Sequence, residues 1–161
     1  MLSIEHIDYR GMERLSNNYD VVYLIVRSLK DKDRGVLLGY DNIFHKPKLS
    51  PSTDLFFKYR KAANAGLWNQ EYFQKYYVPQ FLHEMYQQRD SLIQLYLEAQ
   101  KRNIAIACFC QDETMCHRSI IAGLMQGVAK FRNEAYLIDC AADYSEYHRL
   151  YWNLNGNKQQ M

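Results

Sequence analysis

Three short runs of apolar residues stand out along the chain, and each is nearly continuous in apolar side chains instead of alternating with polar ones. They lie at 21–26, 104–109 and 135–138. Strands that are covered on both faces, as in a parallel sheet, have this composition. The three runs therefore predict buried, parallel strands.

Longer stretches between these runs carry apolar residues at helical spacing. The clearest begins at Asp90 or Ser91 and ends near Asn103. Its apolar face is formed by Leu92, Leu95, Tyr96 and Ala99. Another helix follows Arg118, with a core-facing stripe from Ile120 to Val128. Strands that alternate with helices predict an α/β fold, with a mainly parallel central sheet flanked by helices.

The region before the second recognisable strand predicts a helical insert. Ser50-Pro51-Ser52 opens a helix through Tyr59, and Asn69 opens another through Tyr76. Pro79 should break or kink this second helix before it resumes at 81–86. Upstream of the insert, residues 35–47 hold glycine and proline and predict an exposed or ligand-covering loop.

The length and composition fit one globular domain. The chain has 161 residues, of which 48% are apolar and 24% charged. We place the single α/β domain at 1–154 and predict a frayed tail at 155–161. Near the end, Tyr144, Tyr147 and Tyr151 form a stripe at helical steps. This stripe predicts packing into the core or against a second copy, so a homodimer is a candidate assembly.

The charge and cysteine content restrict the partners and the compartment. A formal net charge of +2 is too small for a broad nucleic-acid footprint. Three of the four cysteines lie within nine residues and do not form a disulfide framework. A polar run follows Met1, and no apolar stretch reaches the length of a membrane span. We expect a soluble, cytoplasmic protein with no membrane partner.

One segment keeps nucleic acid as an alternative partner. Residues Phe56–Lys61 interleave aromatic and basic side chains, as a surface that follows a nucleic-acid strand would. At helical spacing, however, Phe56, Tyr59 and Ala63 form one packed face and the charges a solvated one. We therefore do not expect nucleic acid to be the partner.

The candidate chemistry lies where the second predicted strand ends. Cys108 and Cys110 share one face of this strand, because side chains alternate along it. Cys116, His117 and Arg118 follow where the next helix begins. In open parallel sheets, ligands bind outside the carboxyl ends of the strands, and a helix start adds free N–H groups. Arginine adds a planar fork for phosphate or carboxylate. We expect a small anionic ligand, phosphorylated or nucleotide-like.

The same turn suggests an activated thiol. A cysteine at a helix start, beside an imidazole and a guanidinium, acquires a lowered pKa. Cys116 is thus the predicted nucleophile and most reactive cysteine, with His117 as its acid–base partner, Cys108 buried and slow, and Cys140 ordinary. The alternative is structural. Cys108 is then a small buried hydrophobe, and His117 and Arg118 hold the loop through hydrogen bonds to carbonyls.

The residues of the turn also invite comparison with a phosphatase loop and with a zinc site. Seven residues lie between Cys110 and Arg118, more than the phosphate-wrapping loop of cysteine-dependent phosphatases has, which excludes that class. The sulfurs of Cys108, Cys110 and Cys116 with the ring of His117 are suitable zinc ligands. Their C-x-C and C-H spacing differs from that of common zinc sites. We assign no metal and no cofactor, and leave zinc open.

The segment Cys108-Phe109-Cys110 together with 116–122 resembles the signature of the domain of unknown function 488 family. Stretches within 51–76 are similar to the helical insert of its phage and bacterial members, and Arg27-Ser28 resembles the pair that ends their first strand. The resemblance runs from about Arg27 to Gly123. It implies an α/β fold and a ligand site, but no established reaction. The sequence departs from the pattern at Cys110, where many members carry an acidic residue.

The resulting hypothesis is a protein that binds a small anionic ligand at the strand ends and acts on it chemically if a reaction occurs. Cys116 and His117 are the candidate catalytic residues. The candidate ligand-binding residues are Arg27, Ser28, Cys110, Arg118 and Ser119. The alternative is a module that sequesters or signals without turnover, for which the phage-type insert suggests a counter-defence role.

Overall fold

The computed structural model describes residues 1–8 and 10–156. Its centre is a five-stranded, all-parallel sheet with the strand order β3-β2-β4-β1-β5. The strands are β1 (Leu2–His6), β2 (Val21–Leu24), β3 (Ile43–His45), β4 (Ile104–Cys108) and β5 (Ile138–Asp139). The predicted α/β class, with a parallel central sheet and flanking helices, is confirmed.

Strand β4 lies in the middle of the sheet and is buried along its whole length. It pairs with β1 on one edge and β2 on the other, and His6 at the end of β1 is in register with Cys108 at the end of β4. This double coverage explains why Ile104–Cys108 is apolar throughout. The end of β4 is therefore at the centre of the carboxyl edge, where ligands bind in parallel sheets.

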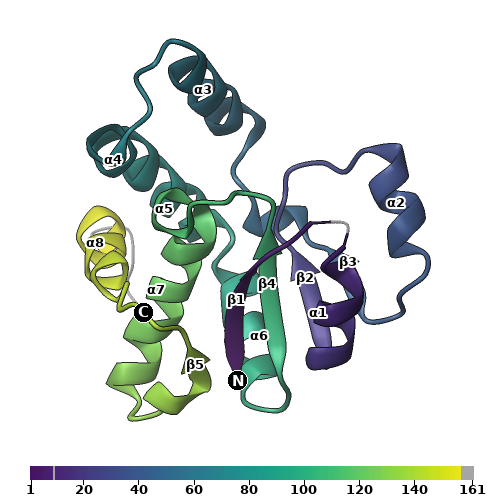
Figure 1. Cartoon of the computed structure of the whole chain (residues 1–161). Coiled ribbons are helices and arrows are strands. Elements are labelled where there is room, and N and C mark those ends of the chain that lie inside the picture. The colour runs from purple at the N-terminus through teal and green to yellow at the C-terminus, as the bar shows by residue number, and fades with distance from the viewer. Residues whose placement is uncertain (9, 157–161) are drawn as a thin grey trace.

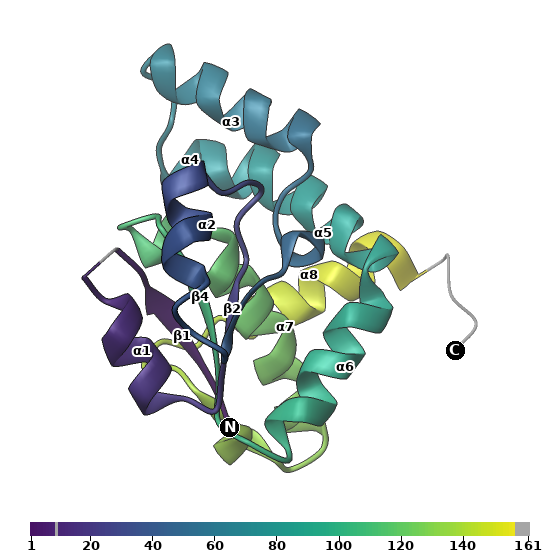
Figure 2. The ribbon, with the colours of Figure 1, turned by 90° about the vertical axis from the view of Figure 1, so that its right-hand side faces the viewer.

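Helices cover both faces of the sheet. They are α1 (Met12–Asn18), α2 (Asp31–Leu37), α3 (Thr53–Asn64), α4 (Gln70–Tyr72), α5 (Val78–Gln87), α6 (Arg89–Ala99), α7 (His117–Phe131) and α8 (Glu146–Asn155). Figure 2 shows α1 on one face and α6 and α7 on the other. Leu92, Leu95, Tyr96 and Ala99 of α6 are buried, as the periodicity predicted. Helix α6 begins at Arg89, one or two residues before the predicted cap.

The helical insert lies over the carboxyl ends of the strands, as Figure 1 shows for α3, α4 and α5. Its helices begin where the sequence predicted. The Ser52 hydroxyl accepts a hydrogen bond from Leu55 N at the start of α3, and the Asn69 side chain accepts one from Tyr72 N at the start of α4. The predicted interruption at Pro79 takes the form of a π-helical turn, Phe73–Tyr77, directly before α5.

Several predicted elements differ from the structure. Strand β1 was missed because its Ser3, Glu5 and His6 make it resemble a polar run. The loop expected at 35–47 instead contains the end of α2 and the short edge strand β3. Residues Ala135–Leu137 form a 3-10 turn, and only Ile138 of the third predicted strand belongs to β5. Strand β5 pairs with only two residues of β1. The apolar run at 135–138 therefore forms a much shorter strand than predicted.

The C-terminal helix packs more tightly than predicted. Asn155, expected at the start of a frayed tail, is the last residue of α8 and is fully buried. Its side-chain amide donates to the Tyr151 carbonyl, and residues 157–161 lie outside the described residues. Tyr147 and Tyr151 are buried, which confirms the packed stripe.

Two smaller findings concern the surface helices. On α3 the buried residues are Leu55 and Ala62, whereas Ala63, predicted on the packed face, is exposed. None of the described helices combines the length and the apolar character needed to cross a membrane.

Candidate functional site

The candidate site is the turn that joins β4 to α7. After Cys108 the chain leaves the sheet and makes a short 3-10 turn, Glu113–Met115, before α7 begins. The Asp112 carboxylate fixes this turn by accepting hydrogen bonds from the backbone N–H and the hydroxyl of Thr114, at 3.0 and 2.6 Å. The turn returns Cys116, the N-cap of α7, to the end of β4.

The turn gathers three cysteines into one cluster. The Sγ atoms of Cys108, Cys110 and Cys116 all lie within 4.8 Å of one another. Cys108 and Cys116 are 4% and 2% exposed, whereas Cys110 is half-buried in the loop. The cluster is therefore shielded from solvent, with Cys110 as its most accessible member. The thiol groups of these three cysteines could bind a soft metal ion.

Arg118 lies against this cluster as a buried cation. Its side chain is 2% exposed, and Nη1 donates to the Cys110 carbonyl at 2.7 Å and to the Cys116 sulfur at 3.6 Å. Its Nε–H is buried and has no hydrogen-bond acceptor. None of the ion pairs found among the described residues includes Arg118. A buried charge without a partner of opposite charge lowers the stability of the fold. A nearby anion would therefore stabilise the Arg118 guanidinium.

His117 joins the start of α7 to the end of β2. Its Nε2 is hydrogen-bonded to the carbonyl of Ile25, the residue after β2. Because a carbonyl only accepts, Nε2 carries the hydrogen in the neutral ring. Nδ1 is left as an acceptor 3.7 Å from the Cys116 sulfur. The edge of the ring packs against Phe81 of α5, at 5.5 Å between centroids. His117 is thus held by sheet and insert at once.

Ser119 has a local structural contact. It is fully buried, and its hydroxyl donates to the Cys116 carbonyl at 2.7 Å. The hydroxyl therefore stabilises the first turn of α7. Ser119 has no solvent-accessible surface through which it could make the predicted contact with a ligand.

Burial and mutual hydrogen bonding set the acidity of the cluster. Hydrogen bonds from Cys110 and Cys116 lower the pKa of the Cys108 thiol. The hydrogen bond to Cys108 raises the pKa of Cys110 to about 11. Burial, followed by the hydrogen bonds with the other two cysteines, raises the pKa of Cys116. The predicted low pKa of Cys116 is therefore wrong, because burial disfavours its thiolate and the other two cysteines raise its pKa further.

Arg27 and Ser28, the other predicted ligand residues, lie apart from the cluster. Both are exposed in the segment after β2. Arg27 lines a separate cavity of about 290 Å³, which no residue of the turn lines. The other residues of this cavity are Pro47, Lys48, Ser50, Ser52, Glu84, Met85, Gln87 and Gln88. The two arginines that were predicted to hold one anion together therefore lie in different parts of the fold.

An aromatic cavity in the insert lies next to the cluster and was not predicted. It has a volume of about 250 Å³. Its walls are Leu55, Lys58, Tyr59, Trp68, Tyr72, Tyr76, Tyr77 and Gln80. After burial, the strongest influence on Tyr59 is charge on Cys110, which raises the tyrosine pKa and reflects the proximity of the two groups. The only sequence signal for this wall is the tyrosine content of the chain, fourteen among 161 residues.

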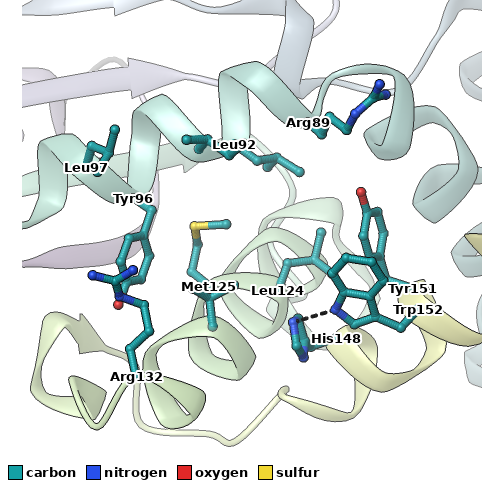
Figure 3. A pocket seen from close by; sticks show the side chains of 12 residues that line it. Arg89, Leu92, Tyr96, Leu97, Leu124, Met125, Arg132, His148, Tyr151 and Trp152 are labelled. Atoms are coloured by element: carbon teal, nitrogen blue, oxygen red, sulfur yellow. Dashed lines mark hydrogen bonds between the residues drawn. The ribbon is translucent and has the colours of Figure 1, made fainter. Parts of the chain in front are cut away.

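Another cavity lies far from this chemistry, between α6, α7 and α8. It measures about 250 Å³ and is mostly apolar, with Leu92, Leu124 and Met125 in its walls. Figure 3 shows Arg89 and Arg132 at its two ends and the hydrogen bond from Trp152 to His148. No residue of the cysteine turn lines it. Its position gives it no part in the strand-end site.

The fold and the turn together define an α/β protein with a cysteine-histidine-arginine site at the carboxyl end of its central strand. The chain belongs to the DUF488 family. Residues 8–128 match the family model DUF488-N3a, described as the active DUF488-N3 subclade. The predicted resemblance is thereby confirmed. Comparison with curated proteins and with solved structures gave no match.

Proposed function

We propose that the protein binds a small anionic ligand, phosphorylated or nucleotide-like, at the turn from Cys110 to Arg118. One observation carries this proposal. Arg118 is buried beside the turn, forms no ion pair with a carboxylate of the described residues, and has an Nε–H without an acceptor. A phosphate or carboxylate would supply the missing charge and the missing acceptor together.

Binding requires the loop to open. The Cys110 carbonyl occupies one donor of the Arg118 guanidinium, so the ligand has to displace it or approach from the Nε side. The adjoining Gln111 and Asp112 are exposed. The acidic side chains of the turn are engaged elsewhere: Asp112 bonds to Thr114, and Glu113 accepts a hydrogen bond from the Tyr144 hydroxyl at 2.6 Å. Neither of these two carboxylates forms an ion pair with the Arg118 guanidinium.

The aromatic cavity supports a ligand with a flat ring. Trp68 stacks on Tyr59 with 4.5 Å between centroids, and Tyr72 and Tyr76 extend the same wall. Proteins commonly bind nucleic-acid bases by stacking them on aromatic side chains, and this contact does not depend on which base is bound. A nucleotide-like ligand would place its ring in this cavity and its phosphate at Arg118.

Chemical conversion of the ligand is the second part of the proposal. The description of the family model as active supports it. Cys110 is the half-buried sulfur that a ligand in the turn would reach, in place of the buried Cys116. Burial of Cys108 and Cys116 instead favours the alternative, a module that binds without turnover. Bound ligand that is recovered unchanged from the purified protein would decide for that alternative.

A reducing cytoplasm suits the site, because three adjacent free thiols stay unpaired there. A homodimer stays a prediction, as does a counter-defence role. Nucleic-acid binding through α3 remains an alternative, with Phe57 exposed and Arg60 at 5.8 Å from the Phe56 ring.

Calorimetric titration with a panel of nucleotides and small phosphorylated compounds tests the binding proposal. We expect Arg118→Met to weaken the tightest ligand about 10- to 100-fold, because a hydrogen-bonded charge is lost. Arg118→Lys, which keeps the charge without the planar fork, should fall between. Arg132→Met is the matched control, since Arg132 is exposed and paired with Glu134. Equal affinity of wild type and Arg118→Met, or no binding by any compound, would refute the proposal.

A further inference from the structure

We infer that Cys108, Cys110 and Cys116 form a zinc site with one coordination position left open. The inference goes beyond the proposed function and does not depend on the anionic ligand. It begins from the sulfur geometry: all three Sγ atoms lie within 4.8 Å of one another at the end of the central strand.

The distances are close to those of a bound metal. A zinc–sulfur bond of about 2.3 Å at tetrahedral angles separates two sulfurs by roughly 3.8 Å. Two of the cysteines lie on rigid elements, Cys108 at the end of β4 and Cys116 at the N-cap of α7. Cys110 lies on the loop, so a small shift of that loop closes the set. The C-x-C spacing differs from that of common zinc sites. The turn nevertheless places Cys116, the third sulfur ligand, beside the end of β4.

The charges favour a divalent ion. Metal binding removes the thiol protons, so three thiolates and a dication carry one net negative charge. The Arg118 guanidinium, with Nη1 at 3.6 Å from the Cys116 sulfur, neutralises that charge. A monovalent ion would leave one negative charge uncompensated in a buried site. Sulfur ligands exclude magnesium and calcium, which prefer oxygen.

The fourth position is open to an outside molecule. Within the part of the chain that the structure describes, no histidine or carboxylate joins the three sulfurs as a further ligand. The Nδ1 atom of His117 lies 3.7 Å from the Cys116 sulfur, but His117 is not among the residues whose ligand atoms all lie within 4.8 Å of one another. Sites with three protein ligands keep the remaining position for water or substrate. Because Cys110 is the most accessible of the three, this position would face the loop.

Cobalt substitution tests the inference on the full chain, stripped of metal by a chelator and kept reduced. We expect added Co²⁺ to give sulfur-to-cobalt charge-transfer absorption and the visible bands of tetrahedral cobalt. Both should saturate at a single equivalent and disappear when Zn²⁺ displaces the cobalt. Cys110→Ser should weaken Zn²⁺ binding by at least about 100-fold, since a bound thiolate matters more than an outer-shell partner.

Cys140→Ser is the matched control, because Cys140 is also half-buried but lies outside the cluster. It should bind cobalt like the wild type. Absence of the charge-transfer band in reduced wild-type protein, or equal metal affinity of Cys110→Ser and wild type, would overturn the inference. The nucleotide titration, run on the metal-free protein, is a separate readout, so either result can fail without the other.

Discussion

Replacing Gly123 with alanine is expected to lower the free energy of unfolding by about 3 kcal/mol, the upper end of the usual overpacking cost. Helix α7 passes so close to the segment before α8 that an added Cβ would lie 2.1 Å from the Tyr144 carbonyl oxygen and 2.8 Å from its carbon. Both are backbone atoms, so α8 has to move. Gly127 is similarly close, with its Cβ position 2.2 Å from the Cβ of His148.

Gly35→Ala is the matched control for this prediction. Gly35 also lies within a helix, α2, but its Cβ position has no atom within 4 Å. Alanine there should stabilise the protein by roughly 0.5–1 kcal/mol, because glycine loses more backbone entropy on folding. Urea unfolding of the two variants measures both effects. Equal shifts in the same direction would show that helix propensity, and not the α7–α8 contact, decides the stability.

Replacing Phe81 with alanine is expected to cost about 3–5 kcal/mol, the range for emptying a fully buried aromatic position. Phe81 is fully buried and stacks on Tyr77, with 6.0 Å between the ring centroids. It also supports His117. The variant should therefore melt roughly 6–20 °C lower, and its His117 ring resonances should shift.

The control for Phe81 is Phe57→Ala on α3, whose side chain is 64% exposed. An exposed substitution of this kind changes stability by about 0.5 kcal/mol or less. Thermal unfolding of the two variants compares them directly. If the two variants had the same melting temperature, the Phe81 ring would not be what holds the insert against the candidate site.

The sequence was most informative where burial is complete. Ile104–Cys108 is covered on both faces and paired on both edges, so its apolar run predicted β4 well. Helix α7, whose turns are buried from His117 onward, was equally clear. At the margins the signal failed. Strand β1 carries polar residues on a half-buried face, and β3 has only three residues at the sheet edge.

The candidate site could be located from the sequence, but its electrostatics could not. Alternation along β4 predicts that Cys108 and Cys110 lie together, and the helix start predicts Cys116 nearby. Nothing local indicates that Cys116 is 2% exposed, or that His117 bonds to Ile25, a contact across 92 positions. Burial reverses the expected acidity of Cys116.

The most direct test of anion binding at Arg118 is the NMR signal of its Nε–H group, identified by its loss in Arg118→Lys. This hydrogen is buried and lacks an acceptor in the free protein. Titration with inorganic phosphate and with a nucleoside monophosphate should shift the Arg118 resonance progressively as its acceptor arrives. If the ligand binds while the Arg118 signal stays unchanged and the Arg27 signal shifts, the anion site lies in the cavity after β2 and not at the cysteine turn.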